Sequence, residues 1–372
     1  MAKDKEKEKD KGSALKVTGG VEQPYSINAN AARRYRKSRS PEMDPDTYIH
    51  GILQGNRMIV SRAITLIESA LPKHHELAQE IIAASLPHSG NSVRIGITGV
   101  PGVGKSTFIE ALGKQLTSKG HKIAVLAIDP SSQRSKGSIL GDKTRMEELA
   151  SDPNAYIRPS SSTGSLGGVA RKTREAITVC EAAGYDVIFV ETVGVGQSET
   201  AVHAMVDFFL LLMLAGAGDE LQGIKRGIME MADAIVINKA DGDNKRKAEL
   251  AKNQYEKALH LFPPAPSGWT PVVRACSSVE KTGVHKVWDT ILNYIALTKN
   301  NGYFYENRNR QAIRIMYEAI DEELKSMFYS DPAIRDLKEQ MENAILKDKI
   351  SAYVAARRLL EKFLKTIKEK KD

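Results

Sequence analysis

The sequence has 372 residues, of which 41% are hydrophobic, so it is long enough to bury the core of one large α/β domain with extensions. It contains no run of 18 apolar residues, which excludes a membrane-spanning helix. Cys180 and Cys276 lie far apart, which excludes a disulfide or zinc framework and favours a reducing, cytoplasmic location. The net charge is +8, but residues 1–40 contribute +6 of it through eleven Lys or Arg against five Asp or Glu, so the remainder is near neutral and we expect no nucleic-acid or membrane partner.

The first 90 residues divide into two segments. Residues 1–40 are rich in charged, Ser and Asn residues and lack the apolar centre of a secretory signal, so we expect a disordered basic leader. In residues 41–90, apolar side chains recur every three to four positions between Asp44 and Leu86, and Pro72 opens a second run. This period predicts an N-terminal helical extension, which ends at the polar joint 87–92.

Residues 91–298 alternate short apolar runs with helical patterns. The helical period is clearest at 171–183 and 245–261. The runs typical of buried strands are 93–98, 123–128, 187–190, 208–214, 234–237 and 272–275. This alternation predicts an α/β fold with a mostly parallel sheet flanked by helices.

Residues 299–372 show three helical patterns, at 306–328, 334–345 and 350–367. Each pattern carries an apolar stripe, and a completed α/β core cannot bury all three stripes. Either the helices form a small local bundle, or they pack against a second copy of the chain. We favour the second interpretation, so this segment is predicted to be the dimerisation arm of a homodimer.

The stretch 99–107, Gly-Val-Pro-Gly-Val-Gly-Lys-Ser-Thr, fits the phosphate-binding pattern G-x-x-x-x-G-K-[S/T]. It stands between a strand-like run and a helical pattern at 108–116, which is the setting that this motif requires. Its glycines let backbone N–H groups surround phosphate oxygens, Lys105 brings a positive charge to the β- and γ-phosphates, and the Ser106 hydroxyl can bind Mg²⁺. The predicted phosphate contacts are Gly99, Val100, Pro101, Gly102, Val103, Gly104, Lys105, Ser106 and Thr107.

A second motif, N-K-A-D at 238–241, follows the apolar run 234–237 and fits N-K-x-D. The Asp241 carboxylate can accept two hydrogen bonds from guanine, whereas adenine has no such pair of donors. Asn238 is expected to brace the loop, and the stem of Lys239 to lie along the base. The next strand-like run ends in residues whose backbone can donate to the guanine carbonyl group: Ser277, Ser278 and Val279. We therefore predict GTP, not ATP, as the nucleotide.

Three acidic residues in loops after strand-like runs or beside glycine are candidates for a Mg²⁺ region: Asp129, Asp142 and Glu191. Mg²⁺ takes few protein ligands and keeps several waters. We expect Ser106 to bind it directly, one carboxylate to bind directly or through water, and the other acids to orient waters. For Asp142, a helix cap or an exposed loop charge explains the residue equally well.

The residue that orients water in Ras-like proteins is missing here. In those proteins a Gln directly follows the glycine of D-x-x-G; here Val195 follows Gly194, and the acid of the motif is Glu191. We therefore expect slow intrinsic hydrolysis, with a rate-enhancing group supplied from elsewhere in the chain or by a partner.

The glycine-rich segment 215–225 is a candidate source of that group, because it follows a predicted strand and emerges at the ligand edge of the sheet. Its candidate switch residues are Asp219, Gln222 and Lys225. An ordinary strand-to-helix loop is the alternative interpretation. We assign catalytic roles to Lys105, Asp129, Glu191 and Lys225.

Together these motifs resemble the SIMIBI-class P-loop GTPases of the MeaB or ArgK family, a group that includes the methylmalonic aciduria type A proteins and was once labelled as the LAO/AO transport kinase. The resemblance runs from about Ile49 to Leu364 and leaves the basic leader outside. The stretches that carry it are 99–107, 129–132, 137–146, 191–199, 238–241 and 266–269.

The resemblance implies a homodimeric GTPase that hydrolyses GTP to GDP and phosphate and acts as a chaperone of methylmalonyl-CoA mutase or a related cobalamin-dependent acyl-CoA mutase. That role implies gating of adenosylcobalamin loading and protection or reactivation of the mutase. Asp129, Asp142 and Glu191 match the acids of the family's Mg²⁺ region, and Lys225 matches its partner-responsive loop. The GTPase domain would then be residues 91–298.

Two other functions remain open. One is a kinase linked to amino-acid transport, which the older family label suggests, although N-K-x-D favours guanine over the ATP that a kinase uses. The other is a metal-insertion GTPase, which usually carries His-rich or C-x-C tracts; here only His74 and His75 are adjacent.

Overall fold

The computed structural model describes residues 43–69, 71–128, 146–159, 166–192, 198–216 and 226–369. The predicted leader, 1–40, lies outside them. Residues Pro45–Asp372 form one unit. Within the described residues, no helix combines the length and apolar character needed to cross a bilayer.

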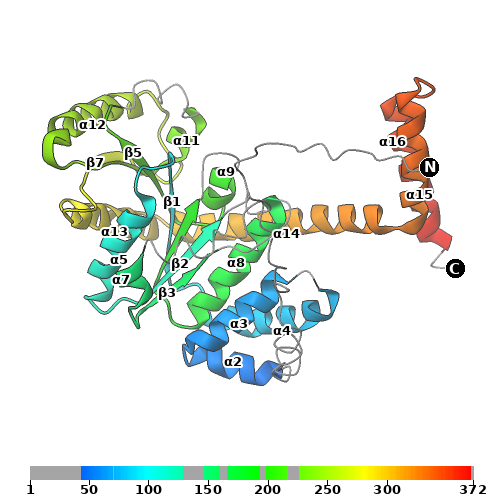
Figure 1. The fold of residues 1–372 in the computed structure, drawn as a ribbon, viewed down its shortest axis with the longest axis horizontal. Coiled ribbons are helices and arrows are strands. Elements are labelled where there is room, and N and C mark those ends of the chain that lie inside the picture. Colours follow the sequence, from blue (N-terminus) through cyan, green and yellow to red (C-terminus); the bar gives the residue numbers. More distant parts are fainter. Residues whose placement is uncertain are drawn as a thin grey trace, which may run out of the picture. The chain divides into compact units, whose positions relative to one another are not determined.

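Seven parallel strands form one sheet, which confirms the predicted fold class (Figure 1). The strands are β1 (Val93–Gly99), β2 (Ile123–Ile128), β3 (Ala155–Arg158), β4 (Val187–Thr192), β5 (Phe208–Leu214), β6 (Ala234–Asn238) and β7 (Val272–Ala275). Their order is β3-β2-β4-β1-β5-β6-β7, and each neighbouring pair is parallel. All six predicted strands are present, and β3 is an additional short strand.

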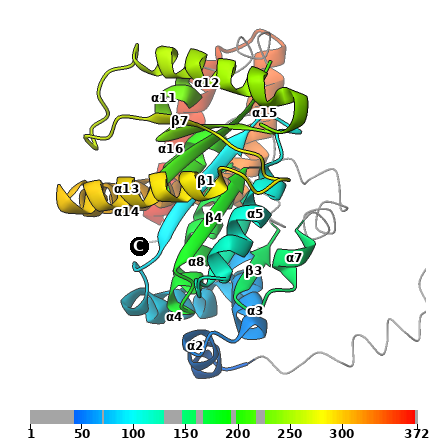
Figure 2. The same ribbon diagram turned by 90° about the vertical axis from the view of Figure 1, so that its left-hand side faces the viewer.

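Helices cover both faces of the sheet (Figure 2). On one face, α5 (Lys105–Thr117) and α13 (Val284–Asn300) form the main core with β1 and β5, where Phe108, Phe208 and Ile291 are fully buried. On the other face, α9 (Ser198–His203) contacts β1 and β4, next to α8 (Leu166–Ala182). The remaining helices of this domain are α7 (Glu147–Ala150), α11 (Arg226–Met231) and α12 (Lys245–Leu259).

The predicted N-terminal extension consists of α2 (Pro45–Leu53), α3 (Arg57–Glu68) and α4 (His75–Ser85), with 3₁₀ turns at Pro72–His74 and Leu86–His88. All three α-helices pack against α8. The chain breaks once more than the periodicity indicates: Gly55 has a positive φ of 68°, and the Asn56 side chain accepts the N–H groups of Met58 and Ile59 at the start of α3.

The three helices expected near the C-terminus are α14 (Tyr303–Ser330), α15 (Pro332–Leu346) and α16 (Ala352–Glu369). The residue-298 boundary falls within α13, and Phe304 of α14 is buried in the core of the α/β domain. Farther along α14 the apolar side chains are exposed, in particular Ile313, Met316, Tyr317, Ile320, Leu324 and Met327. Dimerisation through this surface remains a prediction.

Candidate nucleotide-binding site

The phosphate-binding residues predicted at 99–107 run from the last residue of β1, through a turn at 100–104, into the start of α5, and we call this whole stretch the phosphate loop. Gly99 has a φ of 151°, and a side chain there would collide with the backbone carbonyl oxygen of Leu212 on β5. Gly104 has a φ of 91°, and a Cβ atom there would lie 2.9 Å from the side-chain nitrogen of Asn238. Both positions therefore require glycine.

Helix α5 begins at Lys105, within the phosphate loop, and no side chain caps its N-terminus. The backbone N–H groups of such a helix end, together with its dipole, favour an anion such as a phosphate group. The Lys105 ammonium group donates a hydrogen bond of 2.9 Å to the Gly99 carbonyl oxygen. This bond holds the positive charge beside the loop.

Ser106 and Glu191, predicted to belong to the metal site, lie together in the structure. The Ser106 hydroxyl donates to Oε1 of Glu191 at 3.2 Å, and Glu191 is 5% exposed. Strand register explains the proximity, because Glu191 on β4 is paired with Ile97 on β1. A hydroxyl and a carboxylate are hard oxygen donors of the kind that Mg²⁺ prefers, so this pair fits the ion.

A buried hydroxyl pair that the sequence patterns did not indicate lies next to this site. The Thr192 hydroxyl donates to the Thr98 hydroxyl at 2.9 Å, and both residues are at most 1% exposed. Thr98 directly precedes the phosphate loop, and Thr192 ends β4. The bond therefore links the carboxyl ends of these two neighbouring strands.

The motif at 238–241 forms what we call the base loop, and Asn238 connects it to the phosphate loop. Asn238 is 1% exposed and donates through Nδ2 to the Val103 carbonyl oxygen at 2.8 Å. Its Oδ1 accepts the hydroxyl and backbone N–H of Ser278, at 2.8 and 3.3 Å. One side chain thus holds together the phosphate loop, the base loop and the turn that follows β7.

Asp241 is held by that same turn. Its Oδ2 accepts the Ser277 hydroxyl at 2.5 Å, and Ser277 also forms a backbone bridge to Thr282. Lys239 has a positive φ of 57°, and its side-chain stem approaches Gly104. Val279 is exposed, whereas Ser277 and Ser278 are buried.

Cys276 lies beneath the base loop and is buried. Burial raises the pKa of its thiol to about 12, and a weak hydrogen bond of 3.6 Å runs from Sγ to Oδ1 of Asn238. The thiol therefore stays neutral near pH 7 and packs against the loop as a small apolar group.

Five predicted site residues lie outside the described part of the chain. Asp129 and Asp142 are in the stretch that follows β2, and the other three are in the stretch that follows β5: Asp219, Gln222 and Lys225. Their metal, catalytic and switch roles remain predictions. The strands that precede these stretches, β2 and β5, both end at the carboxyl edge of the sheet.

Comparison with known proteins agrees with this geometry. The sequence model of the family described as "Methylmalonyl Co-A mutase-associated GTPase MeaB" matches residues 60–333. GTPase ArgK of Escherichia coli is 44% identical over 318 residues, which are 86% of this chain and 96% of that protein. The mitochondrial methylmalonic aciduria type A homolog of Mus musculus is 45% identical over 328 residues, which cover 86% of this chain and 79% of that protein.

Among solved structures, a protein titled "LAO/AO transport system kinase" superposes with a TM-score of 0.69 at 38% identity. The alignment covers 87% of this chain and 99% of that one. The similarity therefore extends well beyond the nucleotide-binding loops.

Proposed function

The chain belongs to the MeaB family of GTPases, and from that premise we propose that it is the GTP-dependent chaperone of a cobalamin-dependent acyl-CoA mutase. In this proposal, hydrolysis of GTP to GDP and phosphate gates adenosylcobalamin loading and protects or reactivates the mutase, methylmalonyl-CoA mutase or a relative. The observation that supports this proposal most directly is the bridge of hydrogen bonds that Asn238 forms between the phosphate loop and the base loop. The chain that contains this bridge matches the family over residues 60–333.

Different parts of the site bind different parts of the nucleotide. The phosphate loop and the N-terminus of α5 hold the phosphates, and Lys105 offsets the charge that develops on them in the transition state. Asp241 selects guanine, and the backbone of 277–279 binds its carbonyl group. Ser106 and Glu191, with Asp129 and Asp142, would hold Mg²⁺, which supplies further charge neutralisation when bound.

We further propose that the C-terminal helices form a homodimer. The exposed apolar residues of α14 continue into an apolar groove of about 730 Å³ between α14, α15 and α16. The groove is lined by Phe328, Ile334, Met341, Leu360 and Phe363, among others. A second copy of the chain would remove this apolar surface from water.

The test of the chaperone role is single-turnover GTP hydrolysis with and without purified methylmalonyl-CoA mutase. If the switch group lies in 215–225, docking of the mutase places it, and we expect an acceleration of about 100-fold, which corresponds to about 2.7 kcal/mol of barrier lowering. Lys225→Ala should lose most of this acceleration, whereas the control Lys257→Ala, on the exposed face of α12, should keep it.

Equal acceleration of all three proteins would show that Lys225 is not the switch. No acceleration of any of them would contradict the proposed client. The transport-kinase alternative instead requires ATP binding and phosphoryl transfer to a second protein, so tight binding of ATP would favour it.

A further inference from the structure

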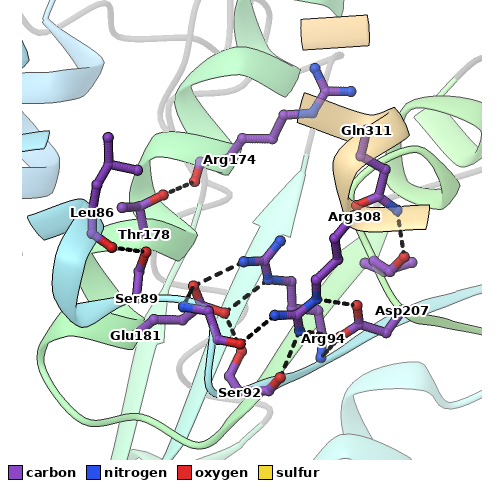
Figure 3. A network of polar contacts seen from close by, with 12 residues as sticks. Leu86, Ser89, Ser92, Arg94, Arg174, Thr178, Glu181, Asp207, Arg308 and Gln311 are labelled. Atoms are coloured by element: carbon purple, nitrogen blue, oxygen red, sulfur yellow. Dashed lines mark hydrogen bonds and ion pairs between the residues drawn. The ribbon is translucent and has the colours of Figure 1, made fainter. Parts of the chain in front are cut away.

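A buried ion pair joins helix α14 to the amino end of the sheet, at the edge opposite the nucleotide-binding site (Figure 3). Arg308 donates through Nε and Nη2 to the two oxygens of Asp207, at 2.7 and 2.6 Å. It also donates to the carbonyl oxygens of Gly90 and Ser92, at 2.5 and 2.7 Å. The side chains of Asp207 and Arg308 are 2% and 13% exposed, so this two-pronged contact is largely removed from water.

The same carboxylate fixes β1 to β5. Oδ2 of Asp207 accepts the backbone N–H of Arg94 at 2.9 Å, and the backbone N–H of Asp207 donates to the Arg94 carbonyl oxygen at 2.9 Å. The Arg94 guanidinium in turn makes two bonds of 2.9 Å to Glu181 of α8, which also accepts the Ser92 hydroxyl. One network therefore ties together α8, α14 and the starts of β1 and β5.

Arg308 and Glu181 remain charged near neutral pH. Burial alone would lower the pKa of Arg308, but the hydrogen bonds and charge of Asp207 outweigh burial and raise it. Burial alone would raise the pKa of Glu181, but Arg94 outweighs burial and lowers it.

At their other ends, β1 and β5 carry the phosphate loop and the chain that leads to 217–225. The two strands are paired from Ile95 and Phe208 to Gly99 and Leu212. Gly99 packs so closely on the Leu212 carbonyl group that a Cβ atom has no room, and the Gly99 carbonyl group holds Lys105. A small slide of β5 along β1 would therefore displace the phosphate loop and its lysine.

We propose that Arg308 is a positioning residue for GTP hydrolysis: by clamping Asp207 it sets the relative position of β1 and β5, and it makes the C-terminal helices part of the nucleotide switch. This inference rests on the GTPase activity of the proposed function but not on the identity of the client. A partner that binds α14, α15 or α16 would change the rate of hydrolysis by shifting the Arg308–Asp207 clamp. By linkage, nucleotide binding would change the affinity for that partner to the same extent.

A different ion pair of α14, which joins it to α8, provides the matched control. Arg174 donates to Glu318 at 2.7 Å, and this pair anchors α14 without touching β1 or β5. Glu318→Gln therefore removes an anchor of the helix but leaves the strand clamp intact. Arg308→Lys keeps the charge and loses the two-pronged geometry, and Arg308→Ala loses both.

The experiment measures single-turnover hydrolysis, GDP affinity and thermal unfolding of the full chain without any mutase. At a temperature where every variant is folded, we expect Arg308→Lys to slow hydrolysis about tenfold while changing GDP affinity less than about threefold, since small misplacements penalise the reaction more than ground-state binding. Arg308→Ala should be slower still, and Glu318→Gln should stay within about twofold of the wild type.

Two outcomes would overturn the inference. If Arg308→Lys lowers the unfolding temperature but hydrolyses GTP at the wild-type rate, Arg308 only anchors α14. If Glu318→Gln is slowed as much as Arg308→Lys, general loosening of the helix, not the clamp, controls the rate. Should Arg308→Ala not fold, Arg308→Lys decides alone. Because the mutase is absent, a wrong client assignment leaves this result unaffected.

Discussion

Replacing Asn238 with alanine tests whether one buried side chain couples the two halves of the nucleotide site. The substitution leaves the Val103 carbonyl group and both donors of Ser278 without their partner. A buried polar group that loses its partner costs about 1–3 kcal/mol, and the Ser278 hydroxyl can rotate to recover part of this. We therefore expect a total loss of about 2–4 kcal/mol, shared between folding and nucleotide binding.

Binding should report most of this loss, because the bond spans the two loops that we propose contact opposite ends of the nucleotide. A loss of about 2–3 kcal/mol in binding corresponds to roughly 30- to 150-fold weaker GDP affinity. Calorimetric titration with GDP measures it, and thermal unfolding of the same samples shows that the variant is folded. Asn244→Ala is the matched control, since the Asn244 side chain makes a local bond of 2.7 Å to the Lys239 carbonyl group and does not bridge the two loops.

The control should bind GDP within about fivefold of the wild type, since only a net contribution of about 1 kcal/mol or less is removed. A folded Asn238→Ala protein with affinity in that same range would refute the reasoning. The two loops would then be held by the packing of β6 and β7 and not by the side chain.

Lys105→Ala should lower the single-turnover rate at least about 100-fold, because it removes a charge aimed at the transferring phosphate; a smaller loss would place the critical charge elsewhere. Asp241→Asn should shift preference from GTP to xanthosine triphosphate, measured by competition binding, since the amide donates where the Ser277-held carboxylate accepts; unchanged preference would contradict the base assignment. Glu181→Gln should destabilise the protein by about 3 kcal/mol in urea unfolding at pH 7, because Arg94 loses its buried partner. Because folding lowers the pKa of Glu181, its ionised carboxylate stabilises the fold above its ordinary pKa of about 4.5, and this stabilisation is lost as pH falls through the pKa of the folded protein. The stability difference between Glu181→Gln and the wild type should therefore shrink in acid, and a difference that does not depend on pH would contradict the linkage.

Local patterns predicted most of the sheet and both nucleotide loops. An uninterrupted apolar run such as 123–128 is sufficient to indicate a strand covered on both faces, and β2 has those bounds. The sequence patterns did not indicate β3, a four-residue strand at the sheet edge that pairs with β2 and ends in Arg158. Its stability comes from tertiary contacts, including the pairing of Arg158 with Glu68 of α3, that no local period reveals.

The candidate site divides in the same way. The glycines and lysine of the phosphate loop act within one short stretch, so the sequence alone places them. The side chains that hold the site in place bond to residues far away in the sequence. Arg308 and Asp207 are 101 residues apart, and Asn238 and Val103 are 135 residues apart. Neither Arg308 nor Asp207 belongs to any motif, and only the fold shows that they meet.

The topology also limits how the C-terminal helices can influence the nucleotide. Strand β1 has seven residues, and at about 3.3 Å per residue it separates its two ends by roughly 20 Å. The charge of Arg308 is matched by Asp207 beside it, so at this distance the two opposite charges largely cancel. A direct electrostatic effect on the phosphates is therefore small. What can cross the sheet is a change in strand position, because Gly99 has no free space against β5. This is why Arg308→Lys, which preserves charge and alters only geometry, is the informative substitution.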